Sequence, residues 1–118
     1  MINKFLRQAI LVLVVVLAVP VGSNTYAPFY IIDGNSMLPA FHPGDMVLVH
    51  HYPLPKIDDW AGKVIVFFDQ ASGRIIIHRV VAIDGQYLKT KGDNNGAVDA
   101  FEPLGQDILG IVYAKIRL

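Results

Sequence analysis

Residues 63–83 read KVIVFFDQASGRIIIHRVVAI, in which two runs rich in Val, Ile and Phe enclose a short polar segment. Runs of this composition are typical of β-strands. We predict strands over Lys63–Phe68 and Arg74–Ile83 and a hairpin loop over Asp69–Gly73. Because Arg74–Ile83 is almost continuously apolar, we expect both of its faces to be covered.

Short apolar runs bounded by turn residues continue on both sides of this hairpin, and no long amphipathic helical pattern competes with them. A two-residue turn signal, Asp84-Gly85, follows the hairpin. The segment Tyr52–Asp59 contains two prolines and two adjacent acids and is predicted to be a loop, with Trp60 closing the core behind it. The sequence therefore predicts a mainly β fold, a small antiparallel β domain. Its remaining strands are expected at Phe29–Ile32, Met46–His51, Gln86–Lys89 and Ile108–Ile116.

Length and composition limit the classes of protein that this chain can belong to. Its 118 residues allow one compact domain and exclude a two-domain enzyme. Ten Lys plus Arg balance ten Asp plus Glu, and this neutral charge argues against nucleic acid as a partner. The chain has no cysteine, so a disulfide framework and a thiolate zinc site are excluded.

The N-terminal segment has the pattern of a sequence directed to a membrane. Ala9–Val19 reads AILVLVVVLAV, follows the basic residues Lys4 and Arg7, and is ended by Pro20. Counted over Phe5–Val21, the apolar stretch just reaches the roughly 17 residues that a bilayer-spanning helix requires. A cleaved secretory signal peptide has a similar charged start and apolar centre and is the alternative.

We expect an uncleaved, single-pass transmembrane helix, which makes residues 1–24 a membrane anchor with its flank and residues 25–118 the β-rich domain. Cytoplasmic flanks of such helices are rich in Lys and Arg. Because the basic residues precede the apolar run, the β domain is expected on the extracytoplasmic side of the membrane. The lipid bilayer is thus an expected partner.

The segment Asp33–Pro39, DGNSMLP, follows a predicted strand and offers the hydroxyl of Ser36 on a backbone that glycine and proline constrain. A nucleophilic serine needs such a presentation. An ordinary polar loop in which Ser36 caps a turn would have the same sequence. The apolar residues beside it, Met37, Leu38 and Phe41, would rest against lipid or pack into the core.

His78 lies inside the predicted strand Arg74–Ile83, where alternation places it and Arg79 on opposite faces. A histidine in an apolar strand is commonly a buried core residue. A serine nucleophile, however, needs a base within hydrogen-bond reach, and neutral histidine is the usual one. His78 is the best-placed candidate. The alternatives lie in a turn or at a strand end: His42, His50 and His51.

A loop near residues 91–99 carries two carboxylates, Asp93 and Asp99, six positions apart. A base histidine works better when a carboxylate fixes its tautomer and stabilises the imidazolium, and either aspartate could serve. An exposed turn would have a similar sequence. A calcium loop of the EF-hand type is not supported, because its ligand spacing and distal glutamate are absent.

Three sequence blocks, GNSMLPAFHPGD at 34–45, IIIHRVV at 75–81 and TKGDNN at 90–95, follow in this order behind an apolar N-terminal segment. Together they resemble the type I signal peptidases, peptidase family S26, over about residues 30 to 101. The usual bacterial branch of that family has lysine as its general base. This sequence has His78 there and so resembles the histidine-base branch of the endoplasmic reticulum, archaea and some Gram-positive bacteria.

The resemblance implies a Ser-His serine endopeptidase that removes signal peptides from exported preproteins. It implies Ser36 as the nucleophile, His78 as the general base, Asp99 as the orienting carboxylate and Asp93 as a supporting residue of the catalytic loop. Signal peptides would be its partners, together with signal-peptidase subunits that the sequence does not identify. The family cuts after small residues and uses neither a metal nor an organic cofactor.

Residues beside the nucleophile would lie near the substrate, namely Gly34, Met37 and Pro39. Ala40 stands where the family commonly has threonine, and Gly34 stands where some members supply an oxyanion-hole hydroxyl. Stabilisation of the oxyanion would then rest on backbone N–H groups such as that of Ser36. A self-cleaving repressor-type peptidase would need a lysine base, and this sequence has His78 at that position. The alternative to a signal peptidase is therefore an inert, membrane-tethered β domain that binds peptides or partner proteins.

Overall fold

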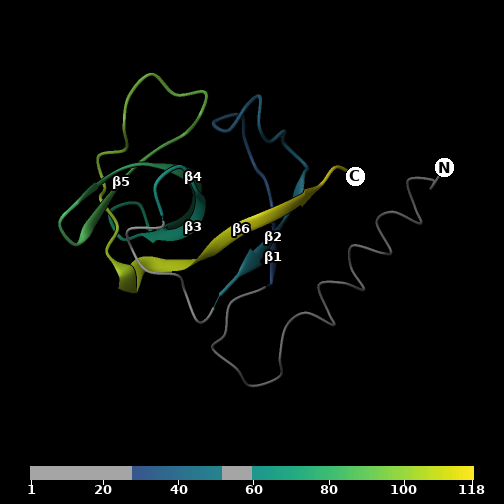
Figure 1. Ribbon diagram of the computed structural model, residues 1–118. Coiled ribbons are helices and arrows are strands. Elements are labelled where there is room, and N and C mark those ends of the chain that lie inside the picture. The colour runs from purple at the N-terminus through teal and green to yellow at the C-terminus, as the bar shows by residue number, and fades with distance from the viewer. Residues whose placement is uncertain (1–27, 52–59) are drawn as a thin grey trace.

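The computed structural model describes residues 28–51 and 60–118, which form a six-stranded antiparallel sheet (Figure 1). The order of the strands across the sheet is β1-β2-β6-β3-β4-β5. The predicted mainly β, antiparallel fold is therefore confirmed. The elements are β1 (Phe29–Ile31), β2 (Met46–His50), β3 (Val64–Asp69), β4 (Arg74–Asp84), β5 (Tyr87–Lys91), a 3₁₀ turn η2 (Gly105–Asp107) and β6 (Ile108–Ile116).

The predicted N-terminal helix and the predicted loop Tyr52–Asp59 lie outside the described residues. Within residues 28–51 and 60–118, no helix has the length and apolar character needed to cross a membrane.

The predicted hairpin β3–β4 is confirmed, but Asp69, predicted to lie in the loop, belongs to β3 and pairs with Arg74, which leaves residues 70–73 in the loop. The carboxylate of Asp69 accepts hydrogen bonds from the backbone N–H groups of Ala71 and Ser72 at 2.8 and 3.2 Å. Gly73 closes the loop at φ +70°, a backbone conformation that favours glycine.

In the hairpin β4–β5 the turn lies one residue later than predicted, and β5 ends two residues later than predicted. Asp84 pairs with Tyr87, so the turn residues are Gly85 and Gln86, with Gly85 at φ +61°. Strand β5 continues to Lys91, whereas the sequence pattern predicted an end at Lys89. Thr90 consequently belongs to the sheet and pairs with β4 across the strand.

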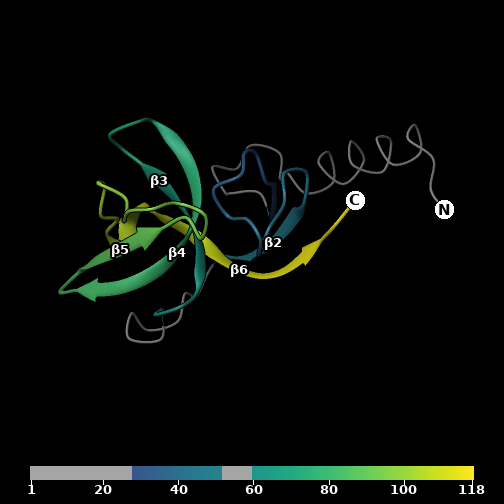
Figure 2. The ribbon, with the colours of Figure 1, turned by 90° about the horizontal axis from the view of Figure 1, so that it is seen from above.

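Strand β6 joins the two halves of the sheet, because it pairs with β2 on one side and β3 on the other. Figure 2 shows β6 running from the β3–β5 half to β2 along one curved path. A Cβ atom on Gly110 would lie 2.3 Å from Cγ1 of Val49, so this approach of β6 to β2 needs glycine.

Two hydrophobic clusters form the core. One lies beneath the Ser36 segment and contains Ile32, Met37, Phe41, Val47, Val49, Val64, Val66 and Leu109. The other fills the β3–β5 half and contains Trp60, Ile65, Phe67, Val80, Leu88, Ile108 and Ile111. Trp60 is buried in the second cluster, as predicted. Met37 and Phe41, for which lipid and core were both open as contacts, are buried in the first cluster.

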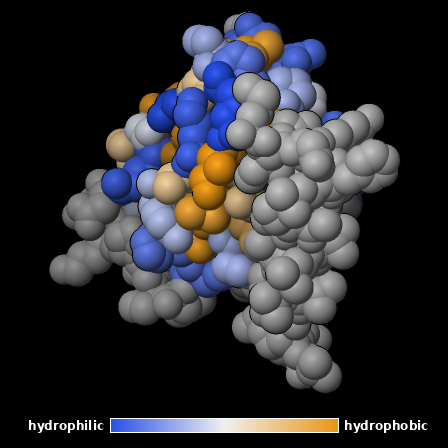
Figure 3. All heavy atoms as spheres, turned by 90° about the vertical axis from the view of Figure 1, so that its right-hand side faces the viewer, coloured by the Kyte–Doolittle hydropathy of each residue, from blue (hydrophilic) through white to orange (hydrophobic). Residues whose placement is uncertain are grey.

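The expectation that both faces of Arg74–Ile83 are covered is wrong. Ile75 and Val81 are 49% and 46% exposed, while His78 and Val80 in the middle of the strand are buried. Both ends of β4 are paired within the sheet. Ile75 lies opposite Phe68, which is itself exposed near the hairpin loop, and Val81 lies at the register shift between β4 and β5. Exposed apolar side chains occur elsewhere too, and Figure 3 shows a hydrophobic patch bordered by hydrophilic residues on the side of the molecule that it presents.

Candidate active site

Ser36 lies in the irregular segment between β1 and β2, which two backbone contacts close at its base. Ile32 N–H donates to the carbonyl of Asp45 at 2.8 Å, and Gly44 N–H donates to the carbonyl of Ile32 at 2.9 Å. Gly34 has φ +91°, so the turn before the serine needs a left-handed backbone that glycine adopts without strain. The segment therefore presents Ser36 on a loop whose two ends are fixed to each other.

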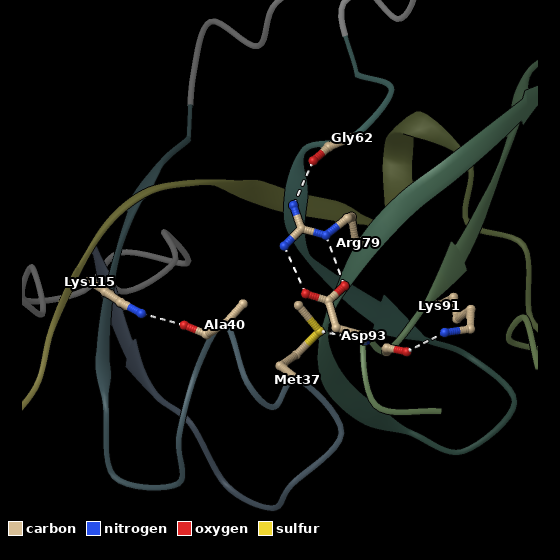
Figure 4. Close-up of polar contacts among 8 residues, drawn as sticks. Met37, Ala40, Gly62, Arg79, Lys91, Asp93 and Lys115 are labelled. Atoms are coloured by element: carbon tan, nitrogen blue, oxygen red, sulfur yellow. Dashed lines mark hydrogen bonds and ion pairs between the residues drawn. The ribbon is translucent and has the colours of Figure 1, made fainter. Parts of the chain in front are cut away.

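The residues after Ser36 fasten this loop to the core. Met37 is only 1% exposed, and Phe41, also buried, donates its N–H to the Met37 carbonyl at 2.9 Å. The Leu38–Pro39 peptide bond between them is cis. The sulfur of Met37 accepts the backbone N–H of Asp93 at 3.4 Å, as Figure 4 shows. Met37 thus links the serine loop to the loop that follows β5.

His78 lies in the middle of β4 and is 8% exposed. Its Nε2 is 3.1 Å from the hydroxyl oxygen of Ser36, and its Nδ1 is 2.6 Å from Oδ2 of Asp99. An ionised carboxylate only accepts hydrogen bonds, so it favours the tautomer with the proton on Nδ1. Nε2 then has a free lone pair that can accept the Ser36 proton.

Asp99 is held by Thr90 of β5 through two contacts. The Asp99 N–H donates to the carbonyl of Thr90 at 2.8 Å, and the Thr90 hydroxyl donates to Oδ2 of Asp99 at 2.7 Å. The same carboxylate oxygen therefore receives hydrogen bonds from Thr90 and His78. The structure thus brings Ser36, His78 and Asp99 together in one chain of hydrogen bonds.

Asp93, the other candidate carboxylate, pairs with Arg79 and not with His78. Arg79 donates Nε to Oδ1 and Nη2 to Oδ2 of Asp93, each at 2.8 Å, and Nη1 to the Gly62 carbonyl at 2.8 Å (Figure 4). The Arg79 hydrogen bonds hold the pKa of Asp93 below its ordinary value. His78 and Arg79, on opposite faces of β4, therefore engage different aspartates of the same loop.

The loop after β5 also packs directly on the Ser36 backbone. Asn94 N–H donates to the Ser36 carbonyl at 2.8 Å, and the Asn94 side chain donates to the Asn35 carbonyl at 3.1 Å. A Cβ atom on Gly92 would lie 2.7 Å from the Ser36 carbonyl oxygen. The KGDNN block therefore positions the backbone of Ser36 and also carries the carboxylate of Asp93.

The remaining histidines have other contacts. His51 Nδ1 lies 2.7 Å from the Leu109 carbonyl, and the His50 ring packs on Tyr113. His42 contacts Arg117, whose guanidinium also binds the buried carboxylate of Asp45. Hydrogen bonds from Arg117 hold the pKa of Asp45 below its ordinary value. Of the four histidines, His78 is the one that the structure places on Ser36.

Two hollows border the site. The smaller, of about 190 Å³, is lined by His78 and Asp99 together with apolar side chains, among them Phe67, Ile76 and Phe101. The larger, of about 500 Å³, lies between Ala40 and Arg79 and reaches the end of β6. Within the described part of the chain, no three His, Asp or Glu side chains are grouped closely enough to hold a metal ion.

Two features of the site were not predicted. The predicted strand ended at Lys89 and the predicted loop began at residue 91, so Thr90 was assigned to neither. Its period-two spacing from buried Leu88 is a signal that it points inward. Contacts from the end of β6, where Lys115 Nζ donates to the Ala40 carbonyl and Arg117 binds Asp45, carry no local sequence signal.

Comparison with known proteins gives the family. Residues 3–98 match the family described as signal peptidase, peptidase S26. Similar proteins include the signal peptidase complex catalytic subunit sec11 of Dictyostelium discoideum, 33% identical over 82 residues that cover 65% of this chain and 44% of the relative. SEC11 of Metarhizium acridum is 33% identical over 94 residues, covering 75% of this chain and 54% of the relative. Human SEC11C is 35% identical over 83 residues, covering 65% and 42%.

This chain spans about half the length of these curated relatives. The match to the family nevertheless extends over most of the chain and includes the Ser36, His78 and Asp93 segments. It confirms the resemblance drawn from the three sequence blocks. This chain therefore belongs to the signal peptidase S26 family.

Proposed function

We propose that this protein is a membrane-anchored serine endopeptidase that removes signal peptides from exported preproteins, with Ser36 as nucleophile and His78 as general base. The observation that carries the proposal is the hydrogen-bond chain from Ser36 through His78 to Asp99, with distances of 3.1 and 2.6 Å. Membership of the signal peptidase S26 family supports the same activity.

The proposed reaction is an acyl transfer in two steps. Ser36 Oγ attacks the scissile carbonyl and forms a C–O bond while its proton passes to Nε2 of His78. The tetrahedral intermediate then loses the amine of the mature protein, which takes that proton from Nε2 as the C–N bond breaks. Water, deprotonated by the same imidazole, hydrolyses the acyl-enzyme and regenerates Ser36.

The two carboxylates take different parts in this proposal. Asp99 keeps the His78 proton on Nδ1 and stabilises the imidazolium that forms during the attack. Asp93, bound to Arg79, supports the loop that packs on Ser36. The backbone N–H of Ser36 is proposed to donate to the oxyanion.

The substrate is proposed to be an extended signal-peptide segment with small residues one and three positions before the cut, as the family resemblance implies. Gly34, Met37 and Pro39 surround Ser36 in the chain and are proposed to lie near the bound segment. The curated relatives are named as catalytic subunits of a signal peptidase complex, and we extend to this chain the possibility of partner subunits.

The proposed location of the protein at the membrane follows from its N-terminal sequence. Residues 1–24 are proposed as a single-pass anchor, with the domain at residues 25–118 on the extracytoplasmic side, where signal peptides emerge from the membrane. N-terminal sequencing of the mature protein tests the anchor. A first residue beyond Val21 would show a cleaved signal peptide and contradict this part of the proposal.

The central experiment is cleavage of a signal-peptide-bearing preprotein by the detergent-solubilised full chain. Wild type is compared with Ser36→Ala, His78→Ala and the control Ser72→Ala, which changes an exposed serine in the β3–β4 loop. We expect wild type and Ser72→Ala to cut after a small residue, and the other two variants to be inactive but folded. Cleavage by Ser36→Ala would contradict the mechanism, and a wild type that binds preprotein without cutting it would favour an inert peptide-binding domain.

A further inference from the structure

Thr90 donates its hydroxyl to the carboxylate that holds the base. Its side chain is fully buried, and its Oγ1 lies 2.7 Å from Oδ2 of Asp99, the oxygen that also accepts from His78 Nδ1. The backbone carbonyl of Thr90 accepts the Asp99 N–H at 2.8 Å. Thr90 therefore fixes both the main chain and the side chain of Asp99.

This double contact limits how the carboxylate can turn. Asp99 lies in the loop after β5, whereas Thr90 is a member of the sheet and pairs with buried Val80 of β4. A loop residue bound at two points to a sheet residue has less freedom to rotate about its χ angles, so Oδ2 stays directed at Nδ1 of His78. Strand β4, which carries His78, thereby sets the position of the Asp99 carboxylate through the neighbouring strand β5.

We propose that Thr90 is a positioning residue of the peptidase site, which keeps His78 in the tautomer protonated on Nδ1 by holding Oδ2 of Asp99 in place. The proposal rests on the proposed Ser36 and His78 chemistry, since a fixed tautomer matters because Nε2 must accept the serine proton. Loss of the hydroxyl leaves the serine and the histidine in place but lets the carboxylate turn away. The fraction of correctly protonated imidazole then falls.

The alternative is a purely structural role for Thr90. A buried threonine hydroxyl needs a hydrogen-bond partner, and the same bond to Asp99 would supply it. The two roles differ in what Thr90→Val changes. Valine keeps the β-branched shape and removes the donor, so a structural role changes the melting temperature alone. A positioning role lowers kcat while KM stays within about twofold, because the site that binds substrate is unaltered. Thr90→Ser keeps the hydroxyl and is the rescue variant.

The first measurement is steady-state cleavage by wild type, Thr90→Val, Thr90→Ser and the control Leu88→Val. Leu88 is equally buried and faces inward from the same strand, and its aliphatic side chain, which loses a methylene in the control, cannot hydrogen-bond Asp99. We expect Thr90→Val to lose roughly 10- to 100-fold in kcat, by analogy with the outer partners that orient metal-binding histidines. Thr90→Ser and Leu88→Val should stay within about threefold of wild type.

The second measurement does not depend on activity. ¹⁵N NMR of histidine-labelled full chain in detergent micelles reports the tautomer, with His78 assigned by the signal that His78→Gln removes. We expect one Nδ1-protonated species in wild type and Thr90→Ser, and a tautomer mixture in Thr90→Val. A Thr90→Val protein with unchanged kcat and one tautomer overturns the proposal. A wild type that holds this tautomer but does not cut preprotein would instead contradict the proposed function.

Discussion

The two sides of the candidate site are held by contacts of different kinds. The His78 side consists of β4, β5 and the loop after it, and the carboxylate bound to His78 lies 21 positions along the chain from it. The Ser36 side contacts the loop after β5 and is in addition tied to residues 115 and 117, much later in the chain. Lys115 of β6 reaches the Ala40 carbonyl and Arg117 reaches Asp45, at separations of 75 and 72 positions.

The burial of these contacts differs as well. On the His78 side the polar contacts are part-buried, where an unpaired group is costly, so they define the geometry of the base. On the Ser36 side, burial of Met37 and Phe41 holds the loop. Lys115 adds an exposed contact, and the half-exposed Arg117 binds the buried carboxylate of Asp45. Changes of polar groups should therefore damage the His78 side more, and changes of volume or backbone should damage the Ser36 side more.

The largest effect is expected for His78→Lys. An ammonium beside Asp99 would remain charged and could not accept the Ser36 proton at neutral pH. Loss of the base of a serine peptidase costs on the order of 10⁶ in kcat, so cleavage should be undetectable. Preprotein cleavage and circular dichroism check this, with an unchanged spectrum as the control for folding. Full turnover by this variant would refute the assignment of His78 as an imidazole base.

Asp99→Asn and Asp93→Asn separate the two carboxylates within the His78 side. Asp99→Asn should lower kcat by about 10⁴, because an amide stabilises the wrong imidazole tautomer and no imidazolium. Asp93→Asn should act mainly on stability, because its partner is Arg79. Kinetics and urea unfolding of both variants check this. If the activity losses were reversed, the assignment of Asp99 to the base would be wrong.

The pH dependence of stability adds a second test for Asp93. Its pKa is lowered in the folded protein by hydrogen bonds from Arg79, so its ionised form stabilises the fold. That contribution is fully present above the ordinary carboxyl pKa of 3.8 and is lost as the pH falls below it. Asp93→Asn should lower the free energy of unfolding by roughly 1–2 kcal/mol at pH 7, between the values of exposed and buried ion pairs. The difference from wild type should shrink below pH 3.8, and a constant difference would contradict the ion pair.

Gly92→Ala tests the contact between the two sides. Its new Cβ would lie 2.7 Å from the Ser36 carbonyl oxygen and 2.6 Å from the Asn95 side-chain nitrogen, so the serine backbone must shift. A displacement near 1 Å can cost about 10² in rate. Gly96→Ala is the matched control, because a Cβ there meets nothing within 4 Å. Equal kcat values for the two variants would show that the loop does not position Ser36.

Sequence patterns predicted the strands and the site residues on the His78 side for a physical reason. Strand alternation and apolar runs are local, and they identified His78 in β4 and the loop with its two carboxylates. Sequence patterns failed to predict burial and strand length where packing between distant segments determines them. Ile75 of β4 is exposed because it lies opposite the exposed Phe68 near the hairpin loop, and Val81 lies at a register shift. Thr90 joins β5 because pairing with Val80 extends the strand.

The choice between Asp93 and Asp99 illustrates the same limit. Spacing in the sequence left both aspartates open as partners of His78, because they lie in the same polar loop. The structure separates them through Arg79, which faces away from His78 and takes Asp93. The contacts of β6 with the Ser36 loop were beyond prediction, since nothing local in residues 114–118 indicates what lies 75 positions earlier.

Arg117→Gln should have the smallest effect and tests the surface tie on the Ser36 side. The guanidinium binds Asp45, whose carboxylate accepts the His42 N–H at 2.8 Å, so its loss loosens the end of the serine loop while Met37 still anchors the loop centre. The Arg117 guanidinium is 55% exposed while the Asp45 carboxylate is buried, so salt screens this pair only in part. We expect kcat to fall about two- to fivefold at low salt and somewhat less at high salt. Arg74→Gln, an exposed arginine at the start of β4, is the control and should leave kcat unchanged. A loss of 100-fold or more in Arg117→Gln would mean that the surface tie, and not burial of Met37, fixes the nucleophile, and the contrast between the two sides would fail.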